Sequence, residues 1–264
     1  MIVLSLFDGI SCAQQALKEL GVTDIIYYAS EIDKYAISIT QKNHPNTIQV
    51  GDVTTLQGKD YKNVDLLIGG SPCQGFSFAG KQLNFEDVRS KLFFKFVDIL
   101  KEVKPKYFIL ENVNMKKEYQ DIISKLLDVK PIMINASLVS AQNRKRLFWT
   151  NIVNVTQPKD KKILLKDIID TNCIAQEKMS ESKRWGNHYG TIETIKSPTL
   201  MAIGKCDCLY LKDKNRFLSP IECERLQSLP DNYTERVSNS RRYKTLGNAF
   251  NCEVIKHILK QILY

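Results

Sequence analysis

The sequence has little that would indicate a metal centre. Its seven cysteines include no Cys-x-x-Cys pair, and only three histidines are present. Structural zinc sites draw four ligands from closely spaced cysteines and histidines, so we expect no metal. An odd number of unpaired cysteines also favours reduced thiols in a reducing compartment.

The sequence also lacks the pattern of a targeting or membrane-spanning segment. Residues 1–8 contain no basic region, and their apolar run is too short for a signal peptide. No apolar stretch approaches the roughly 20 residues that cross a bilayer as a helix. We therefore expect a soluble intracellular protein with no membrane association.

Acidic residues are in deficit, with 29 against 38 basic residues and a formal net charge of +9. Residues 1–150 carry a net charge of +3, and residues 151–264 carry +6. This uneven excess is compatible with a polyanionic partner that contacts mainly the second half. A solvated basic surface is the simpler explanation of charge alone.

The first predicted turn has too few glycines for a dinucleotide site. Residues 2–7 form an apolar run typical of a strand, residues 8–11 a turn, and residues 11–20 an amphipathic helix. A strand, a glycine turn and a helix open nucleotide-type α/β folds. The turn contains only Gly9, which disfavours a nicotinamide oxidoreductase.

The remaining pattern alternates strands with helices up to residue 153. The predicted strands are 25–31, 47–51, 64–68, 107–110, 131–140 and 147–153, and the predicted helices are 33–43 and 88–103. This order predicts an α/β fold with a mostly parallel Rossmann-like sheet and helices on both faces. We assign residues 1–155 and 217–264 to this domain, with helices at 219–229 and 249–263, and residues 156–216 to a small irregular region.

A single cysteine, Cys73, lies in a loop of glycines and proline directly after the predicted strand 64–68. Such a loop at the carboxyl end of a parallel strand faces a ligand crevice. A thiolate there is suited to nucleophilic attack. A small buried hydrophobic residue is the alternative, but the Gly-Gly-x-Pro-Cys-Gln-Gly setting favours the nucleophile.

Two acids also follow predicted strands. Glu31 ends the second strand, where an acid commonly binds ribose hydroxyls, although it could equally stabilise the start of the next helix. Glu111 follows the apolar run 108–110, so we expect partial desolvation that suits proton exchange or binding of a protonated base. Its alternative role is a cap on the next helix.

A basic segment, Gln142-Asn143-Arg144-Lys145-Arg146, lies between the last two predicted strands. If it is extended, Gln142, Arg144 and Arg146 share one face. Two guanidinium groups and an amide could then bind a phosphate or the edge of a base. A solvated basic loop is the alternative.

Six motifs in this order resemble the C5-cytosine DNA methyltransferase family and cover nearly the whole chain except about 156–196. They are Phe7-Asp8-Gly9-Ile10-Ser11, Gly69 to Ser77, Glu111-Asn112-Val113, Gln142-x-Arg144-x-Arg146, residues 218–227 and Leu246-Gly247-Asn248-Ala249-Phe250. The resemblance implies a class I S-adenosylmethionine methyltransferase fold with a small target-recognition region. Ser11 departs from the second glycine of many members.

The resemblance also implies a role for each matching residue. The cofactor S-adenosylmethionine would contact Phe7, Asp8, Gly9, Ser11, Glu31, Ile32, Asp52, Val53, Pro72, Leu92, Asn248 and Phe250. The catalytic set would be Cys73, Glu111, Arg144, Arg146 and Gln142. The DNA contacts would be Gln74, Ser77, Thr199 and Leu200.

The implied chemistry explains why these residue types are needed. Addition of the Cys73 thiolate to C6 would make C5 of cytosine nucleophilic, with Glu111 at N3 and Arg146 at O2 of the ring. The base must leave the helical stack for this reaction. The implied partner is double-stranded DNA, and we expect a monomer whose only link to a cognate restriction endonuclease is functional.

Two other functions remain open from the sequence. An RNA-directed cytosine methyltransferase has the same fold, but its known member has a Cys-Phe-Thr triplet that is absent here. A non-catalytic DNA-binding homologue is the alternative of another class. Intact Cys73, Glu111 and Arg146 argue against it.

Overall fold

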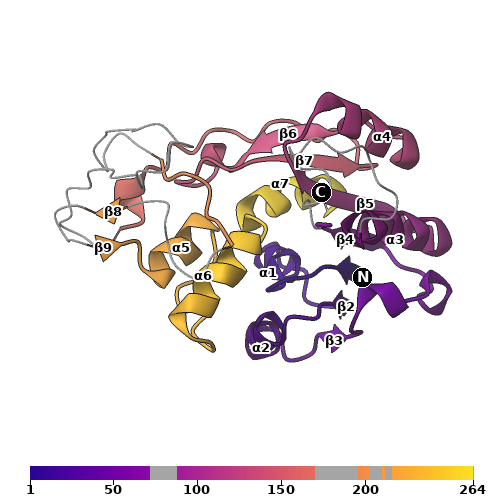
Figure 1. Cartoon of the computed structure of the whole chain (residues 1–264), viewed down its shortest axis with the longest axis horizontal. Coiled ribbons are helices and arrows are strands. Elements are labelled where there is room, and N and C mark those ends of the chain that lie inside the picture. The colour runs from indigo at the N-terminus through magenta and orange to yellow at the C-terminus, as the bar shows by residue number, and fades with distance from the viewer. Residues whose placement is uncertain (72–87, 170–195, 203–209, 212–215, 264) are drawn as a thin grey trace.

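The computed structural model describes residues 1–71, 88–169, 196–202, 210–211 and 216–263 (Figure 1). A seven-stranded sheet forms its centre, in the order β3-β2-β1-β4-β5-β7-β6. The strands are β1 Ile2–Leu6, β2 Ile26–Ser30, β3 Ile48–Gln49, β4 Leu66–Gly69, β5 Tyr107–Val113, β6 Ile132–Asn135 and β7 Lys145–Thr150. Only β7 runs antiparallel to its neighbours in this sheet. The predicted mostly parallel α/β sheet is therefore confirmed.

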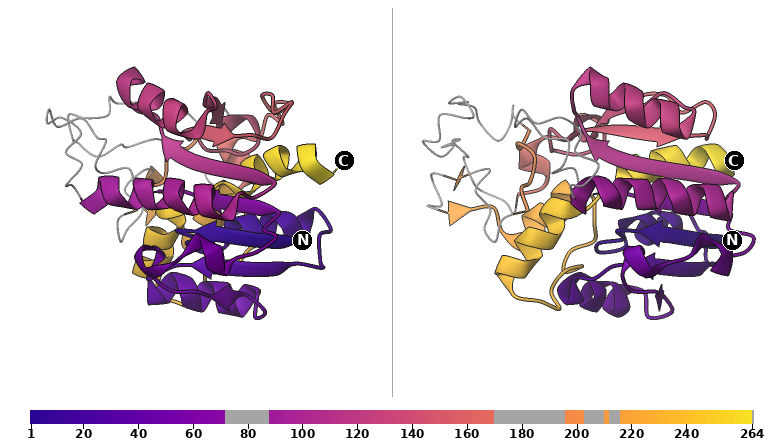
Figure 2. Two further views of the ribbon diagram at one scale, coloured as in Figure 1. Left: turned by 90° about the vertical axis from the view of Figure 1, so that its right-hand side faces the viewer. Right: turned by 45° about the vertical axis from the view of Figure 1, so that its right-hand side comes forward.

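Helices cover both faces of this sheet (Figure 2). The helices are α1 Cys12–Glu19, α2 Lys34–Asn43, α3 Val88–Val103, α4 Lys117–Leu127, α5 Pro220–Leu226, α6 Asn239–Asn248 and α7 Cys252–Leu263. Side chains of α1, α2 and α7 pack on one face, and those of α3 and α4 pack on the other. The last helix, α7, lies against α1, as the apolar spacing of the C-terminal segment predicts. No helix in these described ranges is long and apolar enough to cross a membrane.

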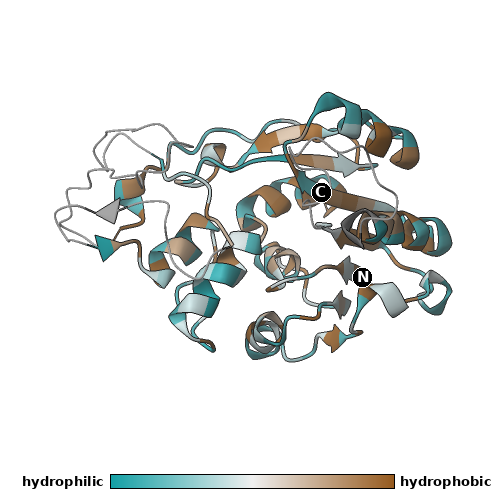
Figure 3. Ribbon diagram, in the orientation of Figure 1, coloured by the Kyte–Doolittle hydropathy of each residue, from teal (hydrophilic) through white to brown (hydrophobic). Residues whose placement is uncertain are grey.

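The strands alternate their side chains between two apolar cores. In β5, Phe108 faces the core under α3 and α4, whereas Ile109 faces the core under α1 and α7. The same alternation places Leu147 and Trp149 on one side of β7 and Phe148 on the other. Burial on both faces explains why these strands are nearly continuous apolar runs (Figure 3). The alternation also decides which polar side chains at the strand ends share a face.

Several elements differ from the sequence prediction, and helix α4 Lys117–Leu127 was not predicted at all. Strand β5 continues through Glu111 to Val113, because antiparallel β7 gives these residues a pairing partner. The expected strand 131–140 stops at Asn135, whose side chain accepts the Ser137 N–H at 3.1 Å and begins the short 3-10 helix Ala136–Leu138. The predicted helix 249–263 is found as α7, but it begins at Cys252. The polar helix α6 before it was not predicted, because it has no apolar run that could indicate it.

Candidate active site

The loop after β1 has an unusual backbone. Phe7, Gly9 and Ser11 all have positive φ angles, of 57°, 62° and 58°. This left-handed conformation costs little for glycine but is strained for serine. The Ser11 hydroxyl offsets the strain by donating to the Asp8 carboxylate and by lying 3.0 Å from Thr40 Oγ1. This explains how serine occupies a position where glycine is the expected residue.

Asp8 supports this loop from inside. Its side chain is buried, and it accepts hydrogen bonds from Ser11 Oγ and, at 2.8 Å, from the Tyr27 hydroxyl. Burial raises the pKa of Asp8 above its ordinary value, although the hydrogen bonds oppose that shift. Both carboxylate oxygens are thus engaged inside the protein, so a ligand would meet the loop backbone rather than the Asp8 side chain.

Glu31 gathers backbone N–H groups at the carboxyl end of β2. One carboxylate oxygen accepts from Gly9 N, and the other accepts from Ile32 N and Asp33 N, all at 2.8 Å. Burial raises the pKa of Glu31. The cap of α2 is Asp33, whose carboxylate accepts from Tyr35 N at 2.9 Å. Glu31 is therefore free of that capping role and fixes the first loop against the second.

The other predicted cofactor residues divide into exposed and buried groups. Ile32 is 74% exposed beside Glu31, an unusual environment for an apolar side chain. Asp52 is exposed and accepts from Thr54 N at 2.8 Å, whereas the Val53 side chain is buried in the core. Leu92 is half-buried on α3. An apolar group uncovered beside a carboxylate matches the needs of an adenosine, with its flat base and ribose hydroxyls.

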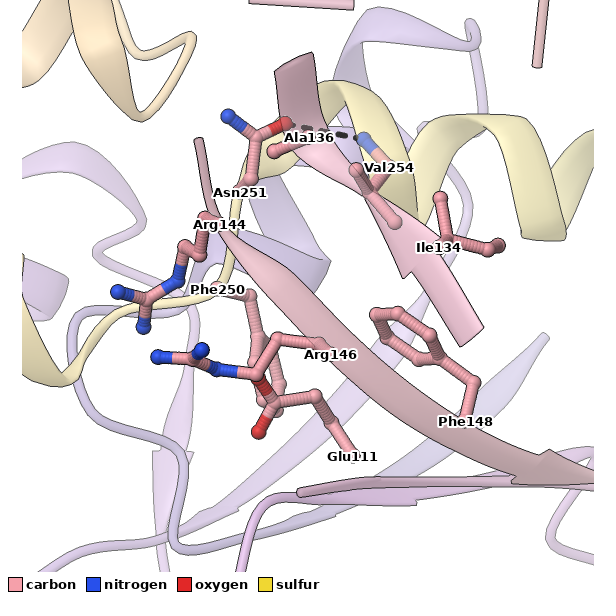
Figure 4. A pocket seen from close by; sticks show the side chains of 9 residues that line it. All are labelled: Glu111, Ile134, Ala136, Arg144, Arg146, Phe148, Phe250, Asn251 and Val254. Atoms are coloured by element: carbon pink, nitrogen blue, oxygen red, sulfur yellow. Dashed lines mark hydrogen bonds and ion pairs between the residues drawn. The ribbon is translucent and has the colours of Figure 1, made fainter. Parts of the chain in front are cut away.

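Glu111 and Arg146 form an ion pair on neighbouring strands. Arg146 Nε lies 2.9 Å from Glu111 Oε1, and the two side chains are only 15% and 12% exposed. They point toward each other on the same face of the sheet (Figure 4). This face is fixed by strand alternation, since Glu111 shares it with Ile109 and Arg146 shares it with Phe148.

The backbone after β4 reaches this ion pair. A Cβ added to Gly70 would lie 2.8 Å from Phe250 Cε1 and 3.3 Å from Glu111 Oε2, so only glycine allows so close an approach. The next residue, Ser71, is buried, and its Oγ lies 3.3 Å from Asn112 Nδ2. Strand β5 thus holds the start of the cysteine loop beside Glu111.

Four predicted site residues, Pro72, Cys73, Gln74 and Ser77, lie outside the described residues. Of the two predicted closing residues, Phe250 is buried beside Gly70, and Asn248 is exposed at the end of α6. The structure therefore brings together Glu111, Arg146 and Phe250.

Gln142 and Arg144 face the interior. Both are buried, and Arg144 donates to three carbonyl oxygens: Ala249 at 2.8 Å, Gly247 at 3.2 Å and Leu200 at 3.4 Å. The open phosphate fork and the solvated loop are therefore both wrong for these two side chains. Burial and the neighbouring Arg146 lower the pKa of Arg144 to about 9, so it stays cationic at neutral pH.

The predicted recognition pair, Thr199 and Leu200, lies against this segment. Thr199 Oγ1 donates to Asn143 O at 2.5 Å, and Leu200 N donates to Gln142 Oε1 at 3.0 Å. The Leu200 side chain is buried in the core. Thr199 is half-buried, so of the two it has the more accessible side chain.

Three polar residues complete the site and were not assigned a role from the sequence. Asn112 holds Ser71, Gln227 Nε2 donates to Leu246 O at 2.7 Å, and Asn251 Nδ2 donates to Leu226 O at 3.0 Å. Asn112 and Gln227 lie inside motifs of the resemblance, and this position was the only available signal. Figure 4 shows the small pocket that Asn251 shares with Glu111 and Arg146.

The sheet order, with one antiparallel strand beside the edge, and the site at the strand ends define a class I methyltransferase fold. Solved structures agree. The Entamoeba histolytica methyltransferase EhMeth matches with a TM-score of 0.75 and 17% identity, over 100% of this chain and 98% of that one. A mutant of Spodoptera frugiperda DNMT2 matches with a TM-score of 0.74 and 22% identity, over 100% of both chains.

Sequence comparison gives the family. The family model for C-5 cytosine-specific DNA methylase matches residues 1–201 and 166–264. Type II methyltransferase M1.ScrFI of Lactococcus lactis subsp. cremoris is 30% identical, over 99% of this chain and 77% of its own length. Type II methyltransferase M.HhaI of Haemophilus parahaemolyticus is 29% identical, over 98% and 93%. The chain belongs to the C-5 cytosine-specific DNA methylase family: it is a DNA cytosine-5-methyltransferase, and its methyl donor is S-adenosylmethionine.

Proposed function

We propose that this protein methylates C5 of cytosine in duplex DNA through a covalent bond between Cys73 and C6 of a flipped base. The observation that supports this most is the half-buried Glu111–Arg146 pair, which lies beside Gly70 at the start of the loop that carries Cys73. Ser71 precedes Cys73 by two residues. A nucleophile, a carboxyl group and a guanidinium are the three groups that this chemistry requires in one place.

Cys73 supplies the nucleophile. Its thiolate adds to C6 of the ring, and the electron pair of the C5–C6 double bond moves toward C5, which makes C5 nucleophilic. Bound S-adenosylmethionine supplies an electrophilic methyl group at its sulfonium. After methylation, a base removes the C5 proton, the C5–C6 double bond reforms, and the thiolate of Cys73 leaves. The products are 5-methylcytosine, a proton and the thioether S-adenosylhomocysteine, and Cys73 returns to its starting thiolate.

Glu111 and Arg146 stabilise the charge that develops on the ring. The Glu111 carboxyl group would hydrogen-bond at N3 of the base, and the Arg146 guanidinium would donate to O2. Their strands pair with each other, and the ion pair is largely shielded from water, so both groups are oriented before the base arrives. Flipping is required because neither C6 nor C5 can be reached face-on inside a stacked duplex.

The cofactor residues fit an adenosyl group at the ends of β1, β2 and β3. Glu31 would bind a ribose hydroxyl through the lone pair on Oε2 that its three N–H partners leave available. Exposed Ile32 would cover one face of the adenine, and Asp52 with Val53 would meet its edge. The left-handed backbone at Gly9 allows the methionine part to approach the loop closely.

Double-stranded DNA would bind on the side that carries the basic excess of the second half. We propose residues 156–216 as the target-recognition region and residues 1–155 with 217–264 as the catalytic domain. The protein would act as a monomer, in the compartment that contains the DNA. A cognate restriction endonuclease would share its recognition sequence without binding it.

Bisulfite sequencing of plasmid DNA from cells that express the protein tests this function. Wild type should methylate cytosines in one short sequence context, and Cys73→Ser should methylate none. Equal methylation by Cys73→Ser would rule out the covalent step. The absence of 5-methylcytosine in DNA with wild type, together with methylated RNA, would identify an RNA-directed enzyme instead.

A further inference from the structure

We propose that Gln142 is a positioning residue that couples the 197–201 segment to the catalytic strand β7. This inference rests on the proposed function of Glu111 and Arg146 and on the proposed role of residues 156–216, which include the 197–201 segment, in target recognition. In this view, part of the selectivity for a DNA sequence arises in the methyl-transfer step. The Gln142 amide, which is buried and cannot reach DNA, would transmit it. Gln142 is 0% exposed, and its whole amide is directed at the protein interior.

The Gln142 amide joins three separate segments. Its Oε1 accepts from Leu200 N at 3.0 Å, and its Nε2 donates to Leu226 O at 3.2 Å and lies 3.4 Å from Gln227 Oε1. The backbone continues this connection, because Gln142 and Ser197 form a parallel β-bridge. Both the main chain and the side chain of Gln142 therefore bind the 197–201 segment to residues 142–146.

The opposite side of the 197–201 segment is equally constrained. A Cβ added to Gly247 would lie 2.3 Å from the carbonyl carbon of Met201, so this backbone passes directly over the end of α6. Arg144 connects the 197–201 segment to the end of α6, since it donates to Leu200 O and to Gly247 O. The segment cannot shift without moving a hydrogen-bonded partner of Arg144.

Arg144 lies two positions before Arg146 in the sequence, so a displacement of Arg144 also moves Arg146. Arg144 is fixed by its carbonyl partners, and Arg146, on the same side of the segment, is fixed by Glu111. When a correct DNA sequence settles the 197–201 segment, the Gln142 amide and Arg144 keep Arg146 at its catalytic position. An incorrect sequence displaces the segment, and the displacement passes to Arg146.

Single-turnover methylation by Gln142→Met tests this coupling. The wild-type recognition sequence is first read from methylated plasmid DNA, and duplexes with one altered base pair then serve as near-cognate substrates. If the lost hydrogen bonds weaken the discrimination between duplexes by about 1.4 kcal/mol, the ratio of their rate constants changes tenfold. We expect the ratio of the cognate to the near-cognate single-turnover rate constant to fall about tenfold, with the Kd for S-adenosylmethionine unchanged.

The matched control is Gln14→Met. Gln14 is another buried glutamine whose amide joins distant residues, since its Oε1 accepts from Thr47 Oγ1 at 2.6 Å. It should lose stability but keep the wild-type ratio. If Gln142→Met also keeps that ratio, or if both variants lower activity equally on all duplexes, the inference is wrong. Inactive wild type would instead contradict the proposed function.

Gln142→Glu gives a second readout that folding alone would not change. An ionised carboxylate accepts from Leu200 N but cannot donate to Leu226 O, whereas its protonated form can do both. Selectivity of this variant should therefore recover as the pH falls, while that of wild type should not. A pH-independent defect in Gln142→Glu would contradict the role of the donated hydrogen bond.

Discussion

The two halves of the site use opposite charges for the same task. On the cofactor side, the Glu31 carboxylate collects three backbone N–H groups, from Gly9, Ile32 and Asp33. On the base side, the Arg144 guanidinium collects three backbone carbonyls, from residues 200, 247 and 249. Each charged side chain organises the loops around it by satisfying backbone groups that would otherwise be unpaired.

The difference lies in the distance along the chain. The partners of Glu31 lie within 22 residues of it, whereas the partners of Arg144 lie 56 to 105 residues away. The cofactor half is therefore assembled locally, within the first strands and helices. The base half exists only when the central sheet, the 197–201 segment and the C-terminal helices have come together.

The largest effect is expected from Arg144→Met. This change removes a charged donor from three buried carbonyl oxygens, of which Ala249 O keeps a hydrogen bond from Gln227 Nε2 at 3.3 Å. We expect a loss of about 3 kcal/mol in the free energy of unfolding. Methyl transfer should fall with it. Urea denaturation and single-turnover kinetics measure the two effects.

Arg144→Lys is the control for this change, because it keeps a cation but lacks the planar fork. Its stability should lie between that of wild type and Arg144→Met. If Arg144→Met is as stable as wild type, the carbonyl groups find other donors. The base half of the site would then not depend on Arg144 for its assembly.

A smaller and more local effect is expected from Glu31→Gln. The amide NH2 would face an N–H donor, and S-adenosylmethionine should bind about 10- to 100-fold more weakly, which corresponds to one or two charged hydrogen bonds. Calorimetric titration measures this, and the KM for DNA should stay unchanged. Asp33→Asn, which retains an oxygen for Tyr35 N, should bind the cofactor nearly as wild type does. Equal weakening by both variants would contradict a special role for Glu31.

The contact of His44 with Tyr233, which links α2 to the C-terminal part of the chain, should make the stability of the protein sensitive to acid. Tyr233 OH donates to Ile10 O at 2.8 Å, so it accepts from His44 Nε2 at 3.1 Å. Burial, and secondarily Lys18, lowers the pKa of His44 from 6.5 to about 4. The unfolded chain takes up this proton more readily, so the stabilisation is present above pH 6.5 and is lost as the pH falls through 4.

The expected loss from His44 between pH 7 and pH 4 is up to about 3 kcal/mol in the free energy of unfolding. Urea denaturation at a series of pH values measures it. His44→Gln has no titrating ring and should show a flatter profile over this range. A profile identical to that of wild type would assign the acid sensitivity to other groups.

The smallest effect is expected from Ser11→Gly. Glycine relieves the strain of the left-handed backbone but loses the hydrogen bond to Asp8, and the two terms are each about 1 kcal/mol. The melting temperature should therefore barely change. Ser11→Ala keeps the strain and loses the hydrogen bond, so it should melt about 2 °C below Ser11→Gly. The reverse order would show that the hydroxyl does not offset the strain.

The sequence by itself determined the parts that depend on short-range pattern. Continuous apolar runs predicted strands buried on both faces, and glycine with acids after those runs predicted loops at their carboxyl ends. Glu31 and Glu111 were found in this way. The structure places Glu31 directly after β2, whereas Glu111 lies inside β5, two residues before its end, because β7 supplies a pairing partner.

Only the tertiary structure decided which way the Gln142–Arg146 segment faces. An extended polar segment looks the same in sequence whether its side chains point to solvent or to buried carbonyls. The partners of Gln142 and Arg144 come from segments that packing brings together, among them the otherwise unremarkable polar helix α6. Local pattern fixes what each stretch can form, but the burial of a charge depends on carbonyl groups that lie far away along the chain.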